Sequence, residues 1–145
     1  MYKKILVPLD GSALAEVVLT HAKALAYSEG AEIVLLRVAA NPALEFAFAD
    51  PALAQSAVNQ FEAEAQKYID DLIANLKNDG YQVSGILAEG PIAEMILQVS
   101  EDIKADTIAM STHGRTGPTR WLIGSIADRV VRSSKVPVML IRPQS

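Results

Sequence analysis

The stretch AEIVLLRV, at residues 31–38, decides the fold class of this chain. Six of its eight residues are apolar, and they do not alternate with polar residues as they would in a strand with one solvent-exposed face. Strands of this kind are buried on both faces, as in parallel sheets that are covered by helices. Apolar runs and segments of helical spacing alternate along the chain in the order βαβαβαβαβ. Residues 1–145 are therefore predicted to form one α/β domain, an open five-stranded parallel sheet with helices on both faces.

The apolar runs place the five expected strands at residues 4–9, 31–38, 81–87, 107–110 and 136–141. The first helix is expected to begin after Ser12, a good N-cap, and to end at Gly30. Residues 41–54 are expected to form a loop, and a long helix follows, whose apolar face is Phe61, Ala65, Tyr68, Leu72 and Leu76. Gly90-Pro91 opens the third helix, with proline at its first position. Ser125 opens the last helix, and its inward residues are expected to be Ile126, Val130 and Val131.

Composition and charge exclude several classes of protein. The chain has 145 residues and a formal net charge of −4, which argues against nucleic acid or an anionic membrane as the main partner. It has no cysteine, so disulfides, thiolate catalysis and zinc–cysteine sites are excluded. The apolar run near the N-terminus is too short for a signal peptide, and no segment reaches the roughly 18 apolar residues of a membrane span. The sequence predicts a soluble, cytoplasmic domain.

Two loops are candidates for a binding site. Ligands of open α/β sheets lie beyond the carboxyl ends of the strands, where the strand order reverses. Residues 8–12 follow the first strand, and the stretch STHGRTGPTRWLIGS, at residues 111–125, joins the fourth strand to the last helix. Gly114 allows a close backbone approach, and Gly124-Ser125 begin a helix whose amino end favours a phosphate. The alternative is that the glycines only make turns and that Ser125 only caps its helix.

Three segments carry a resemblance to a known family: KKILVPLDGS, MSTHGRTG and GSIADRVVRSSKVPVMLIR. Together they resemble the universal stress protein family from the first strand to the last. Nucleotide-binding members of that family share a pattern of Gly, two residues, Gly, nine residues, then Gly and Ser or Thr. Gly114, the nine residues after it and Gly124-Ser125 fit this spacing, whereas Ser111 stands at the position of the first glycine.

The resemblance implies a Rossmann-like sheet in the strand order 3-2-1-4-5, which periodicity alone does not reveal. It also implies a site for ATP, with Mg²⁺ or Mn²⁺ on the phosphates and no dedicated protein metal site. Residues 8–10 would line the adenosine pocket, the backbone of Val38 would hold the adenine edge, and the loop after the fourth strand would surround ribose and phosphates. The residues expected to bind nucleotide are Pro8, Leu9, Asp10, Val38, Met110, Ser111, His113, Gly114, Arg115, Gly124, Ser125 and Ile126.

Two of these residues have alternative interpretations. Asp10 either contacts the ligand or only stabilises the start of the following helix. At Ser111, a backbone with positive φ would make serine costly by about 1 kcal/mol. An extended backbone would accept serine, and its hydroxyl could then donate to a ribose or phosphate oxygen. Strand continuity into residue 111 favours the extended backbone.

A homodimer is expected through the fifth strand. If that strand ends the sheet, residues 136–141 leave an apolar edge, which associates unless it is paired or covered. Its apolar residues are Val136, Val138, Met139, Leu140 and Ile141. The family resemblance also implies pairing through this strand.

The sequence supports three hypotheses of function. The first is a cytoplasmic, ATP-binding sensor or regulator in a stress response, with a nucleotide and an unidentified protein as partners. The second is a slow ATPase that depends on a partner, because no spacing in the chain predicts a group that activates water. The third is a nucleotide-free dimeric interaction module. Gly114 and Gly124-Ser125 favour the first hypothesis, whereas the departure at Ser111 keeps the third one open. No catalytic residue is predicted.

Overall fold

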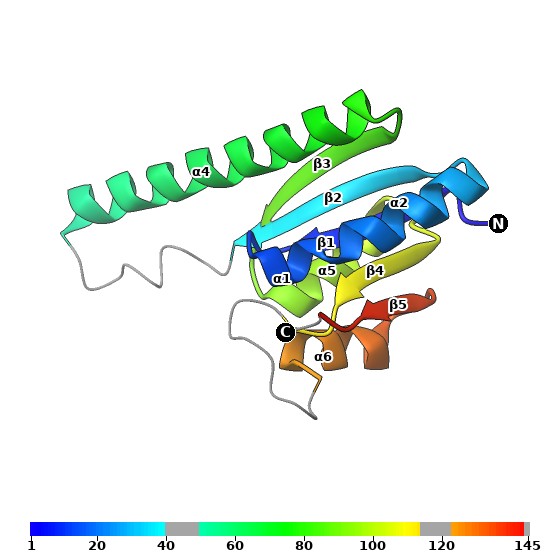
Figure 1. The fold of residues 1–145 in the computed structure, drawn as a ribbon. Helices are drawn as coiled ribbons and strands as arrows, with labels where there is room; N and C mark the ends of the chain where they lie inside the picture. Colours follow the sequence, from blue (N-terminus) through cyan, green and yellow to red (C-terminus); the bar gives the residue numbers. More distant parts are fainter. Residues whose placement is uncertain (40–49, 114–122, 144–145) are drawn as a thin grey trace.

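A computed structural model describes residues 1–39, 50–113 and 123–143. The fold is a parallel sheet whose strands lie in the order β3-β2-β1-β4-β5 (Figure 1). The strands are β1 (Lys4–Leu9), β2 (Glu32–Ala39), β3 (Gln82–Glu89), β4 (Thr107–Ser111) and β5 (Val138–Ile141). Neighbouring strands are all parallel, and β1 pairs with β2 on one side and with β4 on the other. The predicted fold class and strand order are confirmed.

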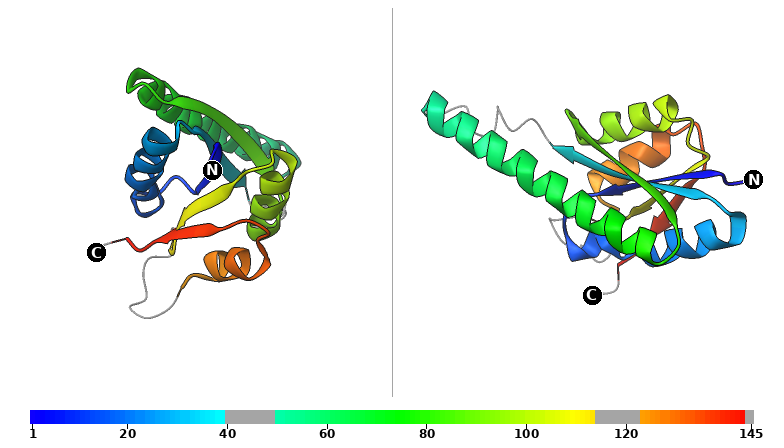
Figure 2. Two further views of the ribbon diagram at one scale, coloured as in Figure 1. Left: turned by 90° about the vertical axis from the view of Figure 1, so that its right-hand side faces the viewer. Right: turned by 90° about the horizontal axis from the view of Figure 1, so that it is seen from above.

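Helices cover both faces of the sheet (Figures 1 and 2). One face carries α1 (Ala13–Glu16), α2 (Val18–Glu29) and α4 (Pro51–Asn78), and the other carries α5 (Ile92–Asp102) and α6 (Ser125–Ser133). Figure 1 shows α4 running along β3 and extending past the end of the sheet. In the described part of the chain, no helix is both long and apolar enough to cross a membrane.

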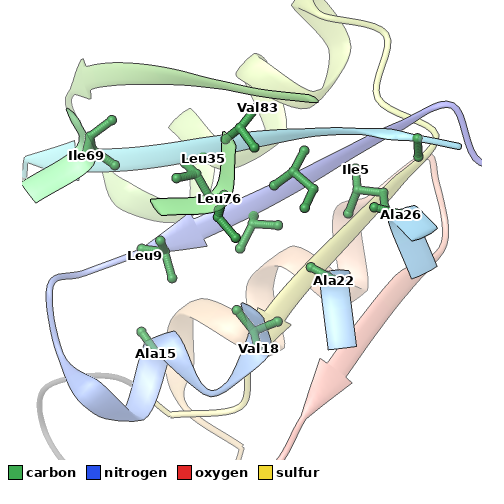
Figure 3. Packing of buried hydrophobic residues seen from close by; sticks show 14 residues of the cluster. Ile5, Leu9, Ala15, Val18, Ala22, Ala26, Leu35, Ile69, Leu76 and Val83 are labelled. Carbon is green, nitrogen blue, oxygen red and sulfur yellow. The ribbon is translucent and has the colours of Figure 1, made fainter. Parts of the chain in front are cut away.

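Side chains of β2 alternate between two separate cores. Ile33 and Leu35 pack with α2 and α4, and Figure 3 shows Leu35 in this first core. Val34 and Leu36 pack with α5 and α6 on the other face of the sheet. All four side chains are buried, which explains why the strand shows no alternation of polar and apolar residues.

Ser12 and Gly30 bound the first helical segment as predicted. The Ser12 hydroxyl accepts a hydrogen bond from Ala15 N at 3.1 Å, and Gly30 adopts the left-handed conformation beyond Glu29. The segment between them is divided at Val17 into α1 and α2.

The long helix begins earlier than predicted. The expected loop at residues 41–54 is wrong in its last part, because α4 starts at Pro51. Asp50 Oδ1 accepts a hydrogen bond from Ala52 N at 2.9 Å, and Pro51 occupies the first turn, where its missing N–H costs nothing. Proline was therefore a helix start here and not a loop signal. Pro91, in contrast, is the N-cap of α5 and not its first residue.

Two expectations near the C-terminus also need correction. The last strand begins at Val138 and not at Val136, because the Ser134 hydroxyl holds both Val136 O (2.7 Å) and Val136 N (3.2 Å) in a turn. In α6, Ile126 and Val131 are 36% and 46% exposed and do not face the core. The buried residues of that helix are Ala127 and Val130.

Candidate functional site

A cavity of about 280 Å³ lies at the carboxyl ends of β1 and β4, where the strand order reverses. Of the residues predicted to bind a nucleotide, ten line this one cavity: Pro8, Leu9, Asp10, Val38, Met110, Ser111, His113, Gly124, Ser125 and Ile126. The other two, Gly114 and Arg115, lie outside the described residues. The volume of the cavity is near the lower end of the range that small-molecule sites occupy.

Much of the apolar wall of the cavity was not predicted from the sequence. That wall includes side chains from β2, α1, α5 and α6, namely Leu36, Ala15, Ile92, Ile96 and Ala127, and Thr112 also borders the cavity. Leu36 could have been found, because it shares a strand face with Val38. The residues of α5 could not, since they approach the cavity only through the strand order. Apolar side chains on facing walls suit a planar aromatic group.

Gly124 brings the start of α6 against the end of β4. Its N–H donates to Thr112 O at 2.8 Å, and a Cβ at Gly124 would lie only 2.9 Å from that same oxygen. The backbone of Gly124 has φ −58° and ψ 153°, a conformation open to any residue. Glycine is therefore required here because of the close approach and not because of the dihedral angles.

The amino end of α6 forms one side of the cavity. Gly124 is the N-cap, and within the described residues no side chain caps this nine-residue helix. Ser125 is the first helical residue, so the alternative that it serves only as the cap is wrong. Ser125, Ile126 and Ala127 all line the cavity, and the amino end of a helix carries a partial positive charge. This end of the cavity suits an anion.

Ser111 fits its position because its backbone is extended. It is the last residue of β4, and Lys104 is the only non-glycine residue with positive φ in the described chain. Its hydroxyl donates to His113 O at 2.7 Å and accepts from His113 N at 3.3 Å. The hydroxyl hydrogen is thus used within the loop, and the expected donation to a ligand stays a prediction that would require the hydroxyl to rotate. The oxygen retains capacity to accept.

His113 is held in the same corner. The ring atom Nδ1 lies 2.9 Å from Thr112 Oγ1, and both side chains are buried. Thr112 N in turn donates to Ile141 O at 2.9 Å, which ties the corner to β5. Hydrogen bonds therefore hold residues 111–113 in place before any ligand is considered.

Asp10 shapes the loop on the opposite wall. Its Oδ1 accepts hydrogen bonds from Ser12 N at 2.9 Å and from Ser12 Oγ at 2.6 Å. Because Ser12 caps α1, Asp10 does stabilise the following helix start, as one of its two interpretations held. It also lines the cavity, so the same residue shapes the loop and borders the candidate site.

A larger hollow of about 550 Å³ lies between α4 and the ends of β2 and β3, and none of the predicted site residues lines it. Glu62 and Glu89 border this hollow, and a hydrogen bond between them raises the pKa of Glu62 above its usual value. The negative charge of two neighbouring carboxyl groups disfavours the binding of a phosphate. Among the described residues, no three His, Asp or Glu side chains come together to hold a metal ion. The smaller cavity is therefore the candidate site.

Comparison with known proteins places the chain in context. The family model described as the universal stress protein family matches residues 1–142. Universal stress protein MJ0577 of Methanocaldococcus jannaschii is 30% identical over 155 aligned residues, which cover 98% of this chain and 96% of that protein. The solved structure of MJ0577 superposes with a TM-score of 0.87 and covers 100% of this chain and 99% of the other.

Two solved structures of lower identity share the fold and contain a nucleotide. A universal stress protein in complex with cAMP is 17% identical, with a TM-score of 0.72 and coverage of 99% of this chain and 98% of the other. A family member from Arabidopsis thaliana with AMP bound is 15% identical, with a TM-score of 0.71 and coverage of 99% and 93%. At these identities the likeness shows the fold.

Proposed function

This chain belongs to the universal stress protein family, and from that premise we propose that it is a cytoplasmic stress-response sensor or regulator that binds ATP. The observation that carries the proposal is the single cavity at the strand-order reversal. An apolar pocket there leads to an uncapped helix amino end, which is the arrangement that an adenosine joined to phosphates requires.

Each part of the cavity has a proposed role. The apolar wall, which includes Leu36, Ile96 and Met110, takes the adenine ring, and the backbone of Val38 holds the adenine edge. The Asp10 carboxylate faces the ribose. The amino end of α6 at Ser125 holds the phosphates, together with Gly114 and Arg115 as the sequence predicts. Mg²⁺ or Mn²⁺ neutralises the phosphates from the solvent side, so the protein needs no metal ligands of its own.

The nucleotides in related structures support this proposal. One of these structures contains cAMP and the other contains AMP, and both ligands contain adenine. Adenine is also the part of ATP that the apolar wall would recognise. The phosphates are where these ligands differ, so the helix end and the loop after β4 would decide between them.

The function is tested by identifying and measuring the ligand. Protein purified without added nucleotide is denatured, and the released small molecules are identified by mass spectrometry. The emptied protein is then titrated by calorimetry with ATP and magnesium, with AMP and with cAMP. We expect an adenine nucleotide to co-purify and ATP to bind. Absence of binding by all three would favour the nucleotide-free interaction module.

Substitutions at Ser111 distinguish the nucleotide-binding function from the nucleotide-free interaction module. Because the backbone is extended and the hydroxyl oxygen still accepts a hydrogen bond, we expect Ser111→Gly to change ATP affinity by less than about tenfold. Ser111→Val should weaken binding more, since it leaves the buried His113 carbonyl without its donor. Calorimetry of both variants with ATP and magnesium measures this. A native protein that does not bind, together with a Ser111→Gly variant that does, would overturn the nucleotide-binding proposal.

We also propose a homodimer through β5. This strand is at the edge of the sheet, and all four of its residues are only half-buried. Pro137 O and Ile141 O accept hydrogen bonds from β4, so by strand alternation the backbone groups of Val138 and Leu140 face away from β4. Another copy of the strand can pair with that side.

Val138→Pro should therefore convert the dimer to a monomer. The change removes one outward N–H but leaves the hydrogen bonds with β4 intact, and proline is tolerated at the first residue of an edge strand. The matched control is Val138→Thr, which keeps both the N–H and the β-branched shape and should remain dimeric. Light scattering at micromolar concentration reports the mass. A monomeric native protein, or a dimeric Val138→Pro variant, would contradict the proposal.

A further inference from the structure

Arg37 is a charged side chain that is only 7% exposed. It lies in β2, directly opposite Leu9 of β1. Its neighbours Leu36 and Val38 line the candidate cavity. Because side chains alternate along a strand, Arg37 extends from the other face of the sheet, where α1, α2 and α4 pack. Arg37 is thus adjacent to the cavity wall in sequence but lies behind it in space.

The guanidinium of Arg37 lies against the backbone of Gly11. A Cβ at Gly11 would collide with the guanidinium, lying 3.0 Å from its Cζ and 3.2 Å from its Nη2. Gly11 also has φ +87°, which L-residues rarely adopt. This glycine sits between Asp10, which lines the cavity, and Ser12, which caps α1. The guanidinium of Arg37 therefore lies beside the turn of this loop.

Two aromatic rings of α4 contact the same guanidinium. The Arg37 Cζ atom is 5.2 Å from the centre of the Tyr68 ring and 5.7 Å from that of Phe61. These distances are typical of cation–π contacts. One arginine consequently bridges the loop after β1 and the long helix.

Electrostatics place Tyr68 in the same cluster. Burial raises the pKa of the Tyr68 hydroxyl above its usual value, the negative charges of Glu16 and Asp10 raise it further, and Arg37 lowers it. The hydroxyl thus senses charges from β2, the loop after β1 and α1. The Tyr68 hydroxyl of α4 therefore lies within electrostatic reach of Asp10, Glu16 and Arg37.

We propose that Arg37 is a positioning residue that fixes the loop of residues 10–12 against α4, so that binding in the cavity and the seating of α4 on the sheet are linked. Linkage is reciprocal. A ligand that requires the loop in this shape stabilises the packing of α4 on the sheet, and a change that loosens this packing weakens binding of the ligand. The part of this proposal that concerns the ligand rests on the proposed function. The part that concerns the loop does not.

The loop is tested in the ligand-free protein by hydrogen exchange of individual amides. Ser12 N donates to Asp10 and Ala15 N donates to Ser12, so these amides report the loop directly. We expect Arg37→Met to speed exchange of both amides by about tenfold. The matched control is Val99→Ala, a buried change in α5 on the opposite face of the sheet, which should leave these two amides at the native rate. Equal exchange in Arg37→Met and native protein would overturn the positioning role.

Binding then tests the link to the cavity, with ATP and magnesium as the probe. Arg37→Met should raise the Kd about fivefold, and Phe61→Leu, a milder change at a partly exposed ring, about twofold, whereas Val99→Ala should not change it. In the native protein, ATP should slow exchange of the amides of residues 61–68. An unchanged Kd in Arg37→Met, or an equal change in Val99→Ala, would contradict the link. If native protein binds no ATP, AMP or cAMP, the proposed function fails, and the exchange of Ser12 still decides the role of Arg37.

Discussion

Gly124→Val should weaken ATP binding by well over tenfold, the largest effect on affinity that we expect from one substitution. A side chain at this position meets the Thr112 carbonyl oxygen, which lies 2.9 Å from where its Cβ would be. The start of α6 must then move away from β4, which breaks the 2.8 Å hydrogen bond from Gly124 N and carries the amino end of the helix out of the cavity wall. Calorimetry with ATP and magnesium measures the loss.

The control for Gly124→Val is Gly80→Ala. Gly80 lies between α4 and the amino end of β3, whereas the cavity is at the carboxyl ends of the strands, and a Cβ at Gly80 would meet no atom within 4 Å. Its φ of +97° makes alanine mildly destabilising, so this variant lowers stability without touching the site. It should bind ATP as the native protein does. Native affinity in Gly124→Val would show that the end of α6 does not hold the ligand.

Ile33→Ala should lower the free energy of unfolding by about 2–5 kcal/mol, the largest effect on stability that we expect. Ile33 is completely buried in the first core, between its partners Ile5 of β1 and Val83 of β3. Removing its side chain leaves a void that three neighbouring strands cannot close. Denaturation by urea, followed by circular dichroism, measures the change.

Ile33 also lies at the amino end of β2, away from the cavity. Ile33→Ala should therefore keep native ATP affinity at temperatures where it is folded. The surface change Gln98→Ala, on the exposed side of α5, should alter stability by less than about 0.5 kcal/mol. A similar loss in both variants would mean that burial of Ile33 does not contribute to stability as the structure indicates.

β1, β2 and β4 were predicted closely because each is a short apolar run with clear ends, whereas β3 is Gln82–Glu89 and not 81–87, and β5 begins two residues later than predicted. The bounds of β1 were correct, and those of β2 and β4 shifted by one residue, because hydrogen bonding continues slightly past the apolar run. The order of the strands in the sheet could not be predicted from local sequence patterns. It depends on pairings such as Ile5 with Thr107, which no local period encodes, and it came from the family resemblance. The early start of α4 was missed because proline both ends loops and begins helices.

The candidate site was predictable where it consists of strand ends and loop glycines. Asp10, Ser111 and Gly124 follow strands or begin a helix, and the sheet brings such positions together. Ile92 and Ile96 were missed as cavity walls, because helical spacing identifies an inward face but not what that face meets. The cluster around Arg37 was missed for the same reason: Phe61 and Tyr68 were predicted to be core residues, and their contact with a charge depends on how α4 crosses β2.

The pairing of β1 with β4 has a consequence for the newly made chain. Lys3 N and Asp106 Oδ2 are hydrogen-bonded although 103 positions separate them, and the cavity extends onward to Ala127. A chain leaving the ribosome can pair β1, β2 and β3 long before β4 exists. The cavity is complete only after α6 has been synthesised, so a chain that stops before α6 has most of the sheet but lacks part of the cavity wall.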